Sequence, residues 1–272
     1  MFFVYLTIYC IVDIINIPYD RGANIRGSSK AFNSIKPYLD NLNVDKIYNI
    51  ETRLNSESRL KNNRILFGNG FIQHQSILNT EKIPLLIGGD HTCAISSIFS
   101  SNNKCISNDK KLGILWFDAH ADFNTIETSP TGNLHGTPVA ILCGHTLPSL
   151  NFGFNLFPSQ FAYYGVRDID SLEFTRFTNY NMNIIDNENM LIDWCKNYDC
   201  IHLSFDMDCI DSSDMYSVNT PVSNGPKLKE VINMLKVVKS TNKLISMDLV
   251  EYNPDMGKNP DIVINILETV LL

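Results

Sequence analysis

The sequence predicts an α/β fold with three layers, in which helices cover both faces of a mostly parallel central sheet. Short apolar runs with the composition of buried strands alternate along the chain with longer segments of helical character. Several of these runs end in acidic residues or histidines, as expected where parallel strands end at one ligand-binding edge. No repeat, low-complexity linker or charge block divides the 272 residues, so we expect a single domain over residues 1–272.

Net charge and cysteine usage exclude several classes of function. The 22 basic and 29 acidic residues give a formal net charge of −7, so the chain lacks the basic character of a nucleic-acid-binding protein. The seven cysteines form no CxxC pair and no regular spacing, which argues against a disulfide framework and against a zinc motif. We therefore expect a cytoplasmic protein with a small-molecule partner and no nucleic-acid or membrane partner.

The opening residues, MFFVYLTIYCIV, are apolar enough to raise the question of a signal peptide. No basic segment precedes this run, Asp13 interrupts it, and no small-residue cleavage pattern follows. The run is also too short to span a bilayer. We therefore expect one or two buried strands here, with a targeting segment as the alternative.

Elements in the first part of the chain follow from apolar runs bounded by glycine, proline and polar residues. After a first strand that ends near Pro18, and a polar turn at Tyr19–Gly27, the expected order is a helix from Ser28 or Ser29 to about Leu42, a strand at Lys46–Ile50, one helix or two short ones over Ser56–Asn79 broken near Gly68 and Gly70, a strand at Pro84–Ile87 and a helix at Thr92–Phe99.

The rest of the chain continues the alternation, and its clearest helix has apolar residues at helical spacing between Leu228 and Val238. The expected order is a strand at Leu112–Phe117, a loop at Thr125–Gly136, a helix at Ala140–Leu142, a strand at Gln160–Val166, a helix at Glu188–Asn197, a strand at Ile201–Phe205, a polar loop at Cys209–Pro226, a helix at Lys227–Ser240, a strand at Lys243–Leu249 and a helix at Asp261–Leu272.

The stretch LGILWFDAHADFN carries the strongest chemical signal. Its buried strand leads directly into Asp118, His120 and Asp122, and residues spaced by two point to one side of an extended chain. Two carboxylates and an imidazole that converge in this way suit a divalent cation. A charged surface loop is the alternative for this segment taken alone.

Three further strands end in residues of the same kind. His91 follows one strand, Asp206 and Asp208 follow another, and Glu251 follows a third. An ordinary solvated sheet edge would also carry lysine and arginine. Even without Glu251, six potential ligands, four of them carboxylates, exceed what one ion needs, so the pattern predicts a site for two metals.

These stretches together resemble the ureohydrolase family, and most closely its arginases. The matching segments occur in the family's order over about residues 11–268, and they are GGDH (Gly88–His91), DAHAD (Asp118–Asp122), GNLHG (Gly132–Gly136), GVRDID (Gly165–Asp170), SFDMD (Ser204–Asp208), Thr220-Pro221 and EYNP (Glu251–Pro254).

The resemblance implies an arginase-like fold and two Mn²⁺ ions per chain. It implies that His91, Asp118, Asp122 and Asp206 bind one ion, and that Asp118, His120, Asp206 and Asp208 bind the other. It implies catalytic roles for Asp122, for His135 as the group that handles protons, and for Glu251 as the carboxylate that binds the guanidinium group. A hydroxide shared by the metals would attack the guanidinium carbon, and the products from L-arginine would be L-ornithine and urea.

The resemblance also implies the substrate. Asn124 and Thr131 match positions that bind the α-carboxylate of arginine, with Ser129 in reach of the same role. Asp170 and Glu173 match positions that bind its α-ammonium group, and Thr220 is counted with the substrate-binding residues. These residues favour arginine over agmatine. The alternative for Asp170 and Glu173 is that they merely begin a helix.

Three departures from the family pattern lie in the loop after Asp208. Cys209 stands in place of a usual glycine, Ser212 in place of proline and Asn224 in place of glycine. They leave open an agmatinase or other guanidino-acid ureohydrolase, and a non-catalytic protein that binds metal or an amino acid. A deacetylase-like zinc hydrolase is a further alternative. A homo-oligomer is left open too, because the longer C-terminal tail of arginases that form trimers is not present.

Overall fold

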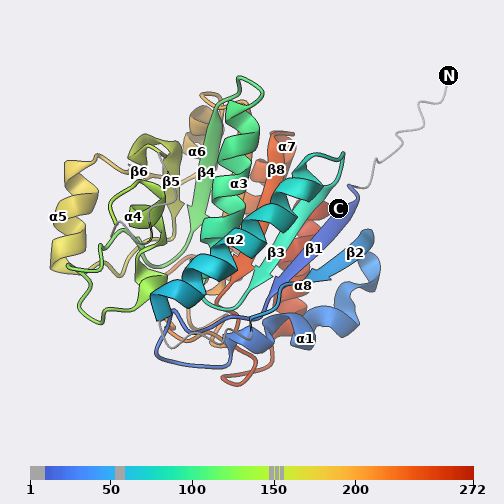
Figure 1. Cartoon of the computed structure of the whole chain (residues 1–272), viewed down its shortest axis with the longest axis horizontal. Helices are drawn as coiled ribbons and strands as arrows, with labels where there is room; N and C mark the ends of the chain where they lie inside the picture. Colours follow the sequence, from blue (N-terminus) through green and yellow to red (C-terminus); the bar gives the residue numbers. More distant parts are fainter. Residues whose placement is uncertain (1–9, 53–58, 147–149, 151–152, 154–155) are drawn as a thin grey trace.

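The computed structural model describes residues 10–52, 59–146, 150, 153 and 156–272, of which 59–66 as backbone only. Eight strands form one sheet in the order β2-β1-β3-β8-β7-β4-β5-β6, and all neighbouring strands are parallel (Figure 1). The predicted α/β class and the parallel sheet are confirmed. Residues 1–9 of the predicted N-terminal strand lie outside the described part, in which β1 begins at Val12.

The strands and helices alternate as expected. The strands are β1 (Val12–Ile17), β2 (Val44–Asn49), β3 (Ile83–Gly88), β4 (Leu112–Phe117), β5 (Phe161–Tyr164), β6 (Asn183–Ile184), β7 (Cys200–Asp206) and β8 (Leu244–Val250). The helices are α1 (Ala31–Ile35), α2 (Arg59–Leu78), α3 (Ala94–Ile106), α4 (Pro138–Leu142), α5 (Ser171–Asn179), α6 (Glu188–Cys195), α7 (Leu228–Ser240) and α8 (Pro260–Leu271). No helix among the described residues is long and apolar enough to cross a membrane.

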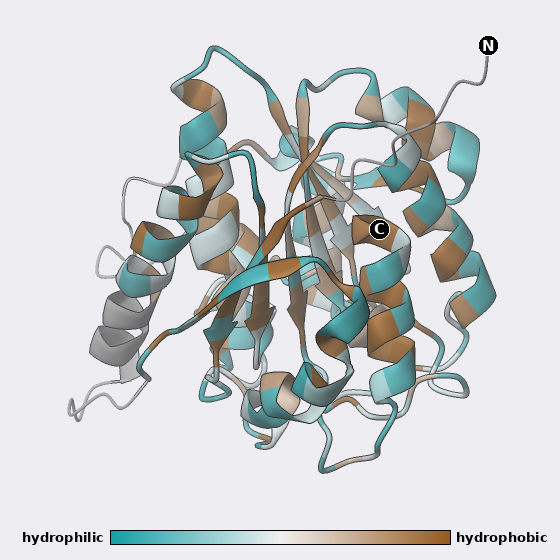
Figure 2. Cartoon of the chain, turned by 90° about the vertical axis from the view of Figure 1, so that its right-hand side faces the viewer, coloured by the Kyte–Doolittle hydropathy of each residue, from teal (hydrophilic) through white to brown (hydrophobic). Residues whose placement is uncertain are grey.

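Helices cover both faces of the sheet, and the alternation of side chains along β4 shows why. Ile114 and Trp116 belong to a buried cluster with residues of α3 and α4. Leu115 and Phe117 point the other way, into a cluster with residues of α1, α6, α7 and α8. Figure 2 shows the hydrophobic strands enclosed between helices on either side. Such a sheet, buried on both faces, leaves its strand ends as the places where polar side chains can gather.

One expectation about helices is wrong, and the structure decides two that were left open. α2 is one continuous helix, which is the first of the two forms left open for this segment; an added Cβ at Gly70 would lie 2.7 Å from Oγ of Ser96, so this glycine permits close approach to α3. The segment expected as one helix from Ser28 to Leu42 is a 3-10 turn, the short α1 and a second 3-10 helix that contains Pro37. Helix α5 agrees with the alternative that Asp170 and Glu173 begin a helix, whereas the two-residue strand β6 was not predicted.

Candidate metal centre and active site

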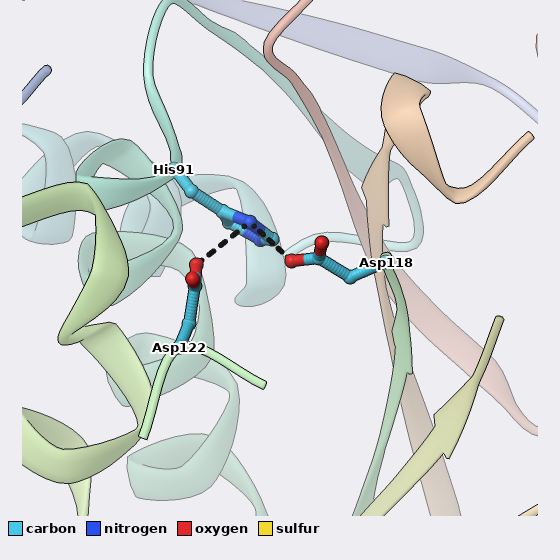
Figure 3. A group of neighbouring side chains, drawn as sticks. All are labelled: His91, Asp118 and Asp122. Carbon is cyan, nitrogen blue, oxygen red and sulfur yellow. Dashed lines mark ion pairs between the residues drawn. The ribbon is translucent and has the colours of Figure 1, made fainter. Parts of the chain in front are cut away.

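The six residues proposed as metal ligands lie together at the carboxyl edge of the sheet. His91 follows β3, and Asp118 and Asp122 follow β4 (Figure 3). Nδ1 of His91 lies 3.0 Å from Oδ2 of Asp118, 3.2 Å from Oδ2 of Asp122 and 3.2 Å from Oδ2 of Asp206, which ends β7. One imidazole nitrogen thus faces three carboxylate oxygens in a buried pocket.

A second group of ligands adjoins the first. Nδ1 of His120 lies 3.4 Å from Oδ1 of Asp118 and 3.2 Å from Oδ2 of Asp208. Asp118 contributes to both groups with its two different oxygens, which is the arrangement of a bridging carboxylate. Oδ1 of Asp206 accepts a hydrogen bond from the backbone N–H of Asp208, so its other oxygen is left for the centre.

The donor set fits two divalent cations. Among the described residues, no lysine or arginine forms an ion pair with any of the four aspartates of this cluster. Burial, followed by the charges of Asp208 and Asp118, raises the pKa of Asp206 well above its usual range. Closely packed carboxylates of this kind need cationic compensation, and an oxygen-rich set with only two imidazoles favours Mn²⁺ over Zn²⁺.

Several groups hold the ligands in position. Nε1 of Trp116 donates a hydrogen bond of 2.9 Å to Oδ2 of Asp118, and its ring stacks on His91 with the centroids 4.1 Å apart. The backbone N–H of Ala119 and Oγ1 of Thr220 donate to the two oxygens of Asp208, at 3.1 and 3.0 Å. The sequence interpretation missed Trp116, although its place two residues before Asp118 puts it on the same side of the strand.

Behind His91, a buried polar chain runs through the core. Nε2 of His91 lies 3.0 Å from Oγ of Ser204, and that hydroxyl donates to Oδ1 of Asp248 at 2.7 Å. The other oxygen of Asp248 pairs with Nε2 of His202 at 2.7 Å, and Nδ1 of His202 lies 2.9 Å from Oγ of Ser101. Because Ser204 binds Nε2 of His91, the ring is oriented with Nδ1 toward the carboxylates.

Two residues of the site have a left-handed backbone. Asp122 has φ of 49° and Glu251 has φ of 62°. Side chains other than glycine adopt this region at a cost, and such conformations concentrate at functional sites. Here they aim the carboxylate of Asp122 back toward His91 and that of Glu251 toward His135.

Glu251 and His135 form a pair at the wall of the cleft. Nδ1 of His135 lies 3.0 Å from Oε1 of Glu251. Oε2 of Glu251 accepts a hydrogen bond of 3.2 Å from Nδ2 of Asn219, a contact that sequence reasoning missed. Burial opposes protonation of His135, but the contact with Glu251 and the charges of Asp122 and Asp90 outweigh it and raise the pKa of His135 to about 9.

A cleft of about 260 Å³ leads from the solvent to the metal-ligand residues. Its lining includes all of the residues predicted to bind substrate, namely Asn124, Ser129, Thr131, Asp170, Glu173 and Thr220. Nδ2 of Asn124 donates a hydrogen bond of 2.6 Å to Oδ2 of Asp170. Sequence reasoning did not include Asp168, which also lines the cleft and lies 3.6 Å from Nε2 of His120.

Asp170 and Glu173 do begin a helix, and they line the cleft as well. Oδ1 of Asp170 caps α5 by accepting the backbone N–H groups of Leu172 and Glu173, each at 3.0 Å. Oε1 of Glu173 accepts the N–H of Phe123 at 2.7 Å. Burial and the charges of Asp122 and Asp170 raise the pKa of Glu173 to about 8. The first turn of α5 therefore holds the carboxyl groups of Asp170 and Glu173 at the cleft.

Comparison with known proteins identifies the family. A family model described as Arginase family matches residues 12–271. The chain belongs to the arginase family. Arginase from Staphylococcus aureus (strain COL) is 33% identical over 236 residues, which cover 80% of this chain and 70% of that protein. The crystal structure of arginase from Bacillus subtilis matches with a TM-score of 0.83 at 26% identity, covering 96% of this chain and 98% of that one.

The arginase fold is shared more widely. A Clostridium difficile protein described provisionally as an agmatinase matches with a TM-score of 0.76 at 20% identity, covering 97% of each chain. That likeness concerns the fold alone. Membership of the arginase family makes this chain a ureohydrolase, and the choice of guanidino substrate has to be argued from the cleft.

The loop after Asp208, in which this arginase-family chain departs from the family pattern, is anchored by Arg167. The Arg167 guanidinium group donates to backbone carbonyls on both sides of the loop, including those of Asp208 and Cys209 at 2.9 and 3.1 Å and that of Val222 at 2.9 Å. Sequence reasoning assigned Arg167 no role. Its position inside the GVRDID motif was the available signal.

The structure accommodates two of the departures locally. Cys209 is fully buried, and its thiol donates to the carbonyl of Tyr164 at 3.3 Å. A Cβ added to Gly165 would lie only 2.7 Å from Sγ of Cys209. The larger residue at position 209 is therefore accommodated because it packs against a glycine. Asn224 adopts φ of 62°, a conformation that asparagine tolerates better than most residues. Neither residue lines the cleft.

Proposed function

We propose that this ureohydrolase converts L-arginine to L-ornithine and urea with two Mn²⁺ ions per chain. The observation that carries the substrate assignment is the position of Asp170 and Glu173 in the cleft that contains the metal-ligand residues. A substrate whose guanidinium group lies at the metal centre places its other end toward these two carboxyl groups. Arginine has an α-ammonium group to meet them, whereas agmatine has neither an α-ammonium nor an α-carboxylate group.

The two ligand groups described above would hold the manganese ions, with Asp118 between them. The group of ligands around His91 and the group around His120 together supply four carboxylates and two imidazoles. When bound, the metal pair supplies Lewis acidity that makes water acidic enough to react near neutral pH.

Glu251 and His135 are the residues proposed to handle the guanidinium group and the proton. The carboxylate of Glu251 is held by His135 and Asn219 and lines the cleft, where a planar cation can meet it. The raised pKa of His135 keeps a proton on its ring near neutral pH. We therefore assign His135 to protonation of the leaving amine, because expulsion of a neutral amine is easier than expulsion of its anion.

Asn124, Thr131 and Ser129 are the proposed partners of the α-carboxylate. The hydroxyl oxygens of Thr131 and Ser129 accept backbone N–H groups of Asn133 and Gly132 at 3.2 and 3.1 Å. Each hydroxyl proton is therefore free to point into the cleft toward an anion.

The seven cysteines form no disulfide, which supports a reducing, cytoplasmic compartment. We infer one catalytic domain. Assembly into homo-oligomers stays a prediction.

Urea release from arginine and from agmatine, measured side by side after incubation with Mn²⁺, tests the proposal. We expect arginine to be strongly preferred, and we expect Glu173→Gln to reduce that preference mainly through a higher KM for arginine. Leu172→Ala, at an exposed neighbouring position on α5, is the matched control. Faster turnover of agmatine would overturn the substrate assignment. Absence of turnover with two metals bound would instead indicate a non-catalytic binding protein.

A further inference from the structure

A second cleft lies at the amino edge of the sheet, opposite to the candidate metal centre. It has a volume of about 280 Å³ and is enclosed by the first residues of β3, β7 and β8 and the last turns of α2 and α3. Two cysteines line it: Cys105, in the last turn of α3, and Cys200, the first residue of β7. Neither residue takes part in the ureohydrolase site.

The two thiols are in direct contact. A side-chain hydrogen bond joins Cys105 to Cys200. Both residues are largely buried, at 2% and 5% exposure, and the cleft is the opening through which a small reagent reaches them. The pair joins two elements far apart in sequence, since β7 and α3 are separated by the whole of β4 to α6.

Their surroundings make the two sulfur atoms chemically different. The hydrogen bond from Cys105, helped by the positive charges of Lys110 and Lys243, lowers the pKa of Cys200 to about 7. The same hydrogen bond, together with burial, raises the pKa of Cys105. Near neutral pH a substantial fraction of the molecules therefore carries a Cys200 thiolate beside the Cys105 thiol, which is the arrangement of a nucleophilic and a resolving cysteine.

Three other buried cysteines and the half-buried Cys143 have the opposite character. Burial raises the pKa of Cys143 to about 12 and that of Cys195 to about 11. It raises the pKa values of Cys93 and Cys209 well above the usual range. These four thiols remain protonated and serve as internal controls for any test of reactivity.

We propose that Cys200 and Cys105 form a reactive dithiol, which a small hydroperoxide entering the amino-edge cleft oxidises to a disulfide that links β7 to α3. The Cys200 thiolate attacks the terminal oxygen of the hydroperoxide, the O–O bond breaks, and the alkoxide leaves and takes up a proton to become an alcohol. Cys200 is then a sulfenic acid. The Cys105 sulfur attacks the Cys200 sulfur, the S–O bond breaks, and hydroxide leaves as water with the Cys105 proton. Two electrons pass from the two thiols to the peroxide.

The proposal is tested on the full-length, reduced protein with hydrogen peroxide and with tert-butyl hydroperoxide. We expect a loss of two mass units and a Cys105–Cys200 cross-linked peptide in the digest. In Cys105→Ser the reaction is expected to stop at a sulfenic acid on Cys200, which dimedone traps. In Cys200→Ser, Cys105 is expected to stay reduced. Cys195→Ser is the matched control, because it removes a nearby buried thiol and should leave the cross-link unchanged.

A measurement on the unmodified chain guards against variants that fail to fold. The rate of alkylation by iodoacetamide at pH 7 is followed for each cysteine by peptide mass spectrometry. We expect Cys200 to react at least ten times faster than Cys143 or Cys195. Equal rates at these three positions, or a wild-type protein whose peroxide oxidation produces no Cys105–Cys200 cross-link, would overturn the proposal.

Discussion

The guanidinium group of Arg167 donates a hydrogen bond of 2.9 Å to the backbone carbonyl of Asp208, a residue of the candidate metal centre. Arg167 also binds the carbonyls of Gly165, Cys209, Ile210, Val222 and Ser223. One side chain thus joins the segment after β5 to both ends of the loop after β7. Arg167 thus holds the loop that departs most from the family pattern through backbone carbonyls, and these contacts do not depend on the side chains of the loop.

Replacement of Arg167 by lysine should therefore loosen this loop. A lysine ammonium group cannot reproduce a planar fork of five donors, so several carbonyls lose their partner. We expect the free energy of unfolding to fall by about 2 kcal/mol and the metal near Asp208 to bind more weakly. Urea denaturation and manganese titration measure the two effects. Arg26→Lys, which affects backbone carbonyls of a different turn, should leave metal binding unchanged.

Asp248→Asn should weaken metal binding although Asp248 is not a proposed ligand. Asp248 accepts the Ser204 hydroxyl that holds Nε2 of His91, and an amide cannot accept on both oxygens. Loss of such supporting contacts typically costs 10–100-fold in metal affinity, so we expect about that change. Titration with Mn²⁺ monitored by electron paramagnetic resonance measures it. Ser246, on the same strand, contacts His74 rather than His91, so Ser246→Ala is the control. Equal affinity of the two variants for Mn²⁺ would contradict the prediction.

Removal of metal should destabilise the protein. Without cations, the carboxylates around His91 and His120 repel one another in a buried site. Saturation at about 100 times the Kd is expected to stabilise the fold by about 2.7 kcal/mol per ion. Differential scanning calorimetry with Mn²⁺ and with a chelator measures the change in Tm. Asp206→Asn should show the reverse pattern, with a more stable metal-free form and a smaller gain on adding Mn²⁺.

Buried His74 should make the folded protein less stable at acidic pH, independently of the metal. Burial lowers the pKa of His74 well below its usual range, and Nε2 lies 2.7 Å from Oγ of Ser246. Because the unfolded chain binds this proton near pH 6.5 and the folded chain does not, stability present above that pH is lost as the pH falls. His74→Gln, which keeps a polar contact but does not titrate, should lose about 2 kcal/mol less stability than the natural chain between pH 7 and pH 5. Parallel unfolding curves for the two proteins would contradict this.

The parts of the fold that local pattern determines could be predicted from the sequence. The bounds of β4 match the expectation, and the spacing of Asp118, His120 and Asp122 is enough to bring them together, because a strand end fixes the direction of alternate side chains. The residues of the candidate site were all found at one sheet edge for the same reason: in a parallel sheet every strand contributes its carboxyl end there.

What could not be predicted depends on contacts between distant segments. Gly70 suggested a break, but its role is set by Ser96 on another helix. Asp248 and Ser204 gave no signal because a carboxylate inside an apolar strand is interpretable only once its partners are known. The direction of Cys209, into the core and toward Tyr164 rather than into the cleft, follows from packing against Gly165. Each of these features joins residues more than 20 positions apart.

The left-handed backbone at Asp122 and Glu251 has a consequence for how such a protein can evolve. Conformations of this kind cost about 1 kcal/mol or more for a residue that has a Cβ, and Asp122 adds the repulsion of its neighbours. Asp122→Gly should therefore make the metal-free chain harder to unfold while it abolishes manganese-dependent activity. Selection for durability alone would favour that change. The aspartate at this position thus supports activity at the expense of stability, and a laboratory search for thermostable variants that omits an activity screen should drift toward its loss.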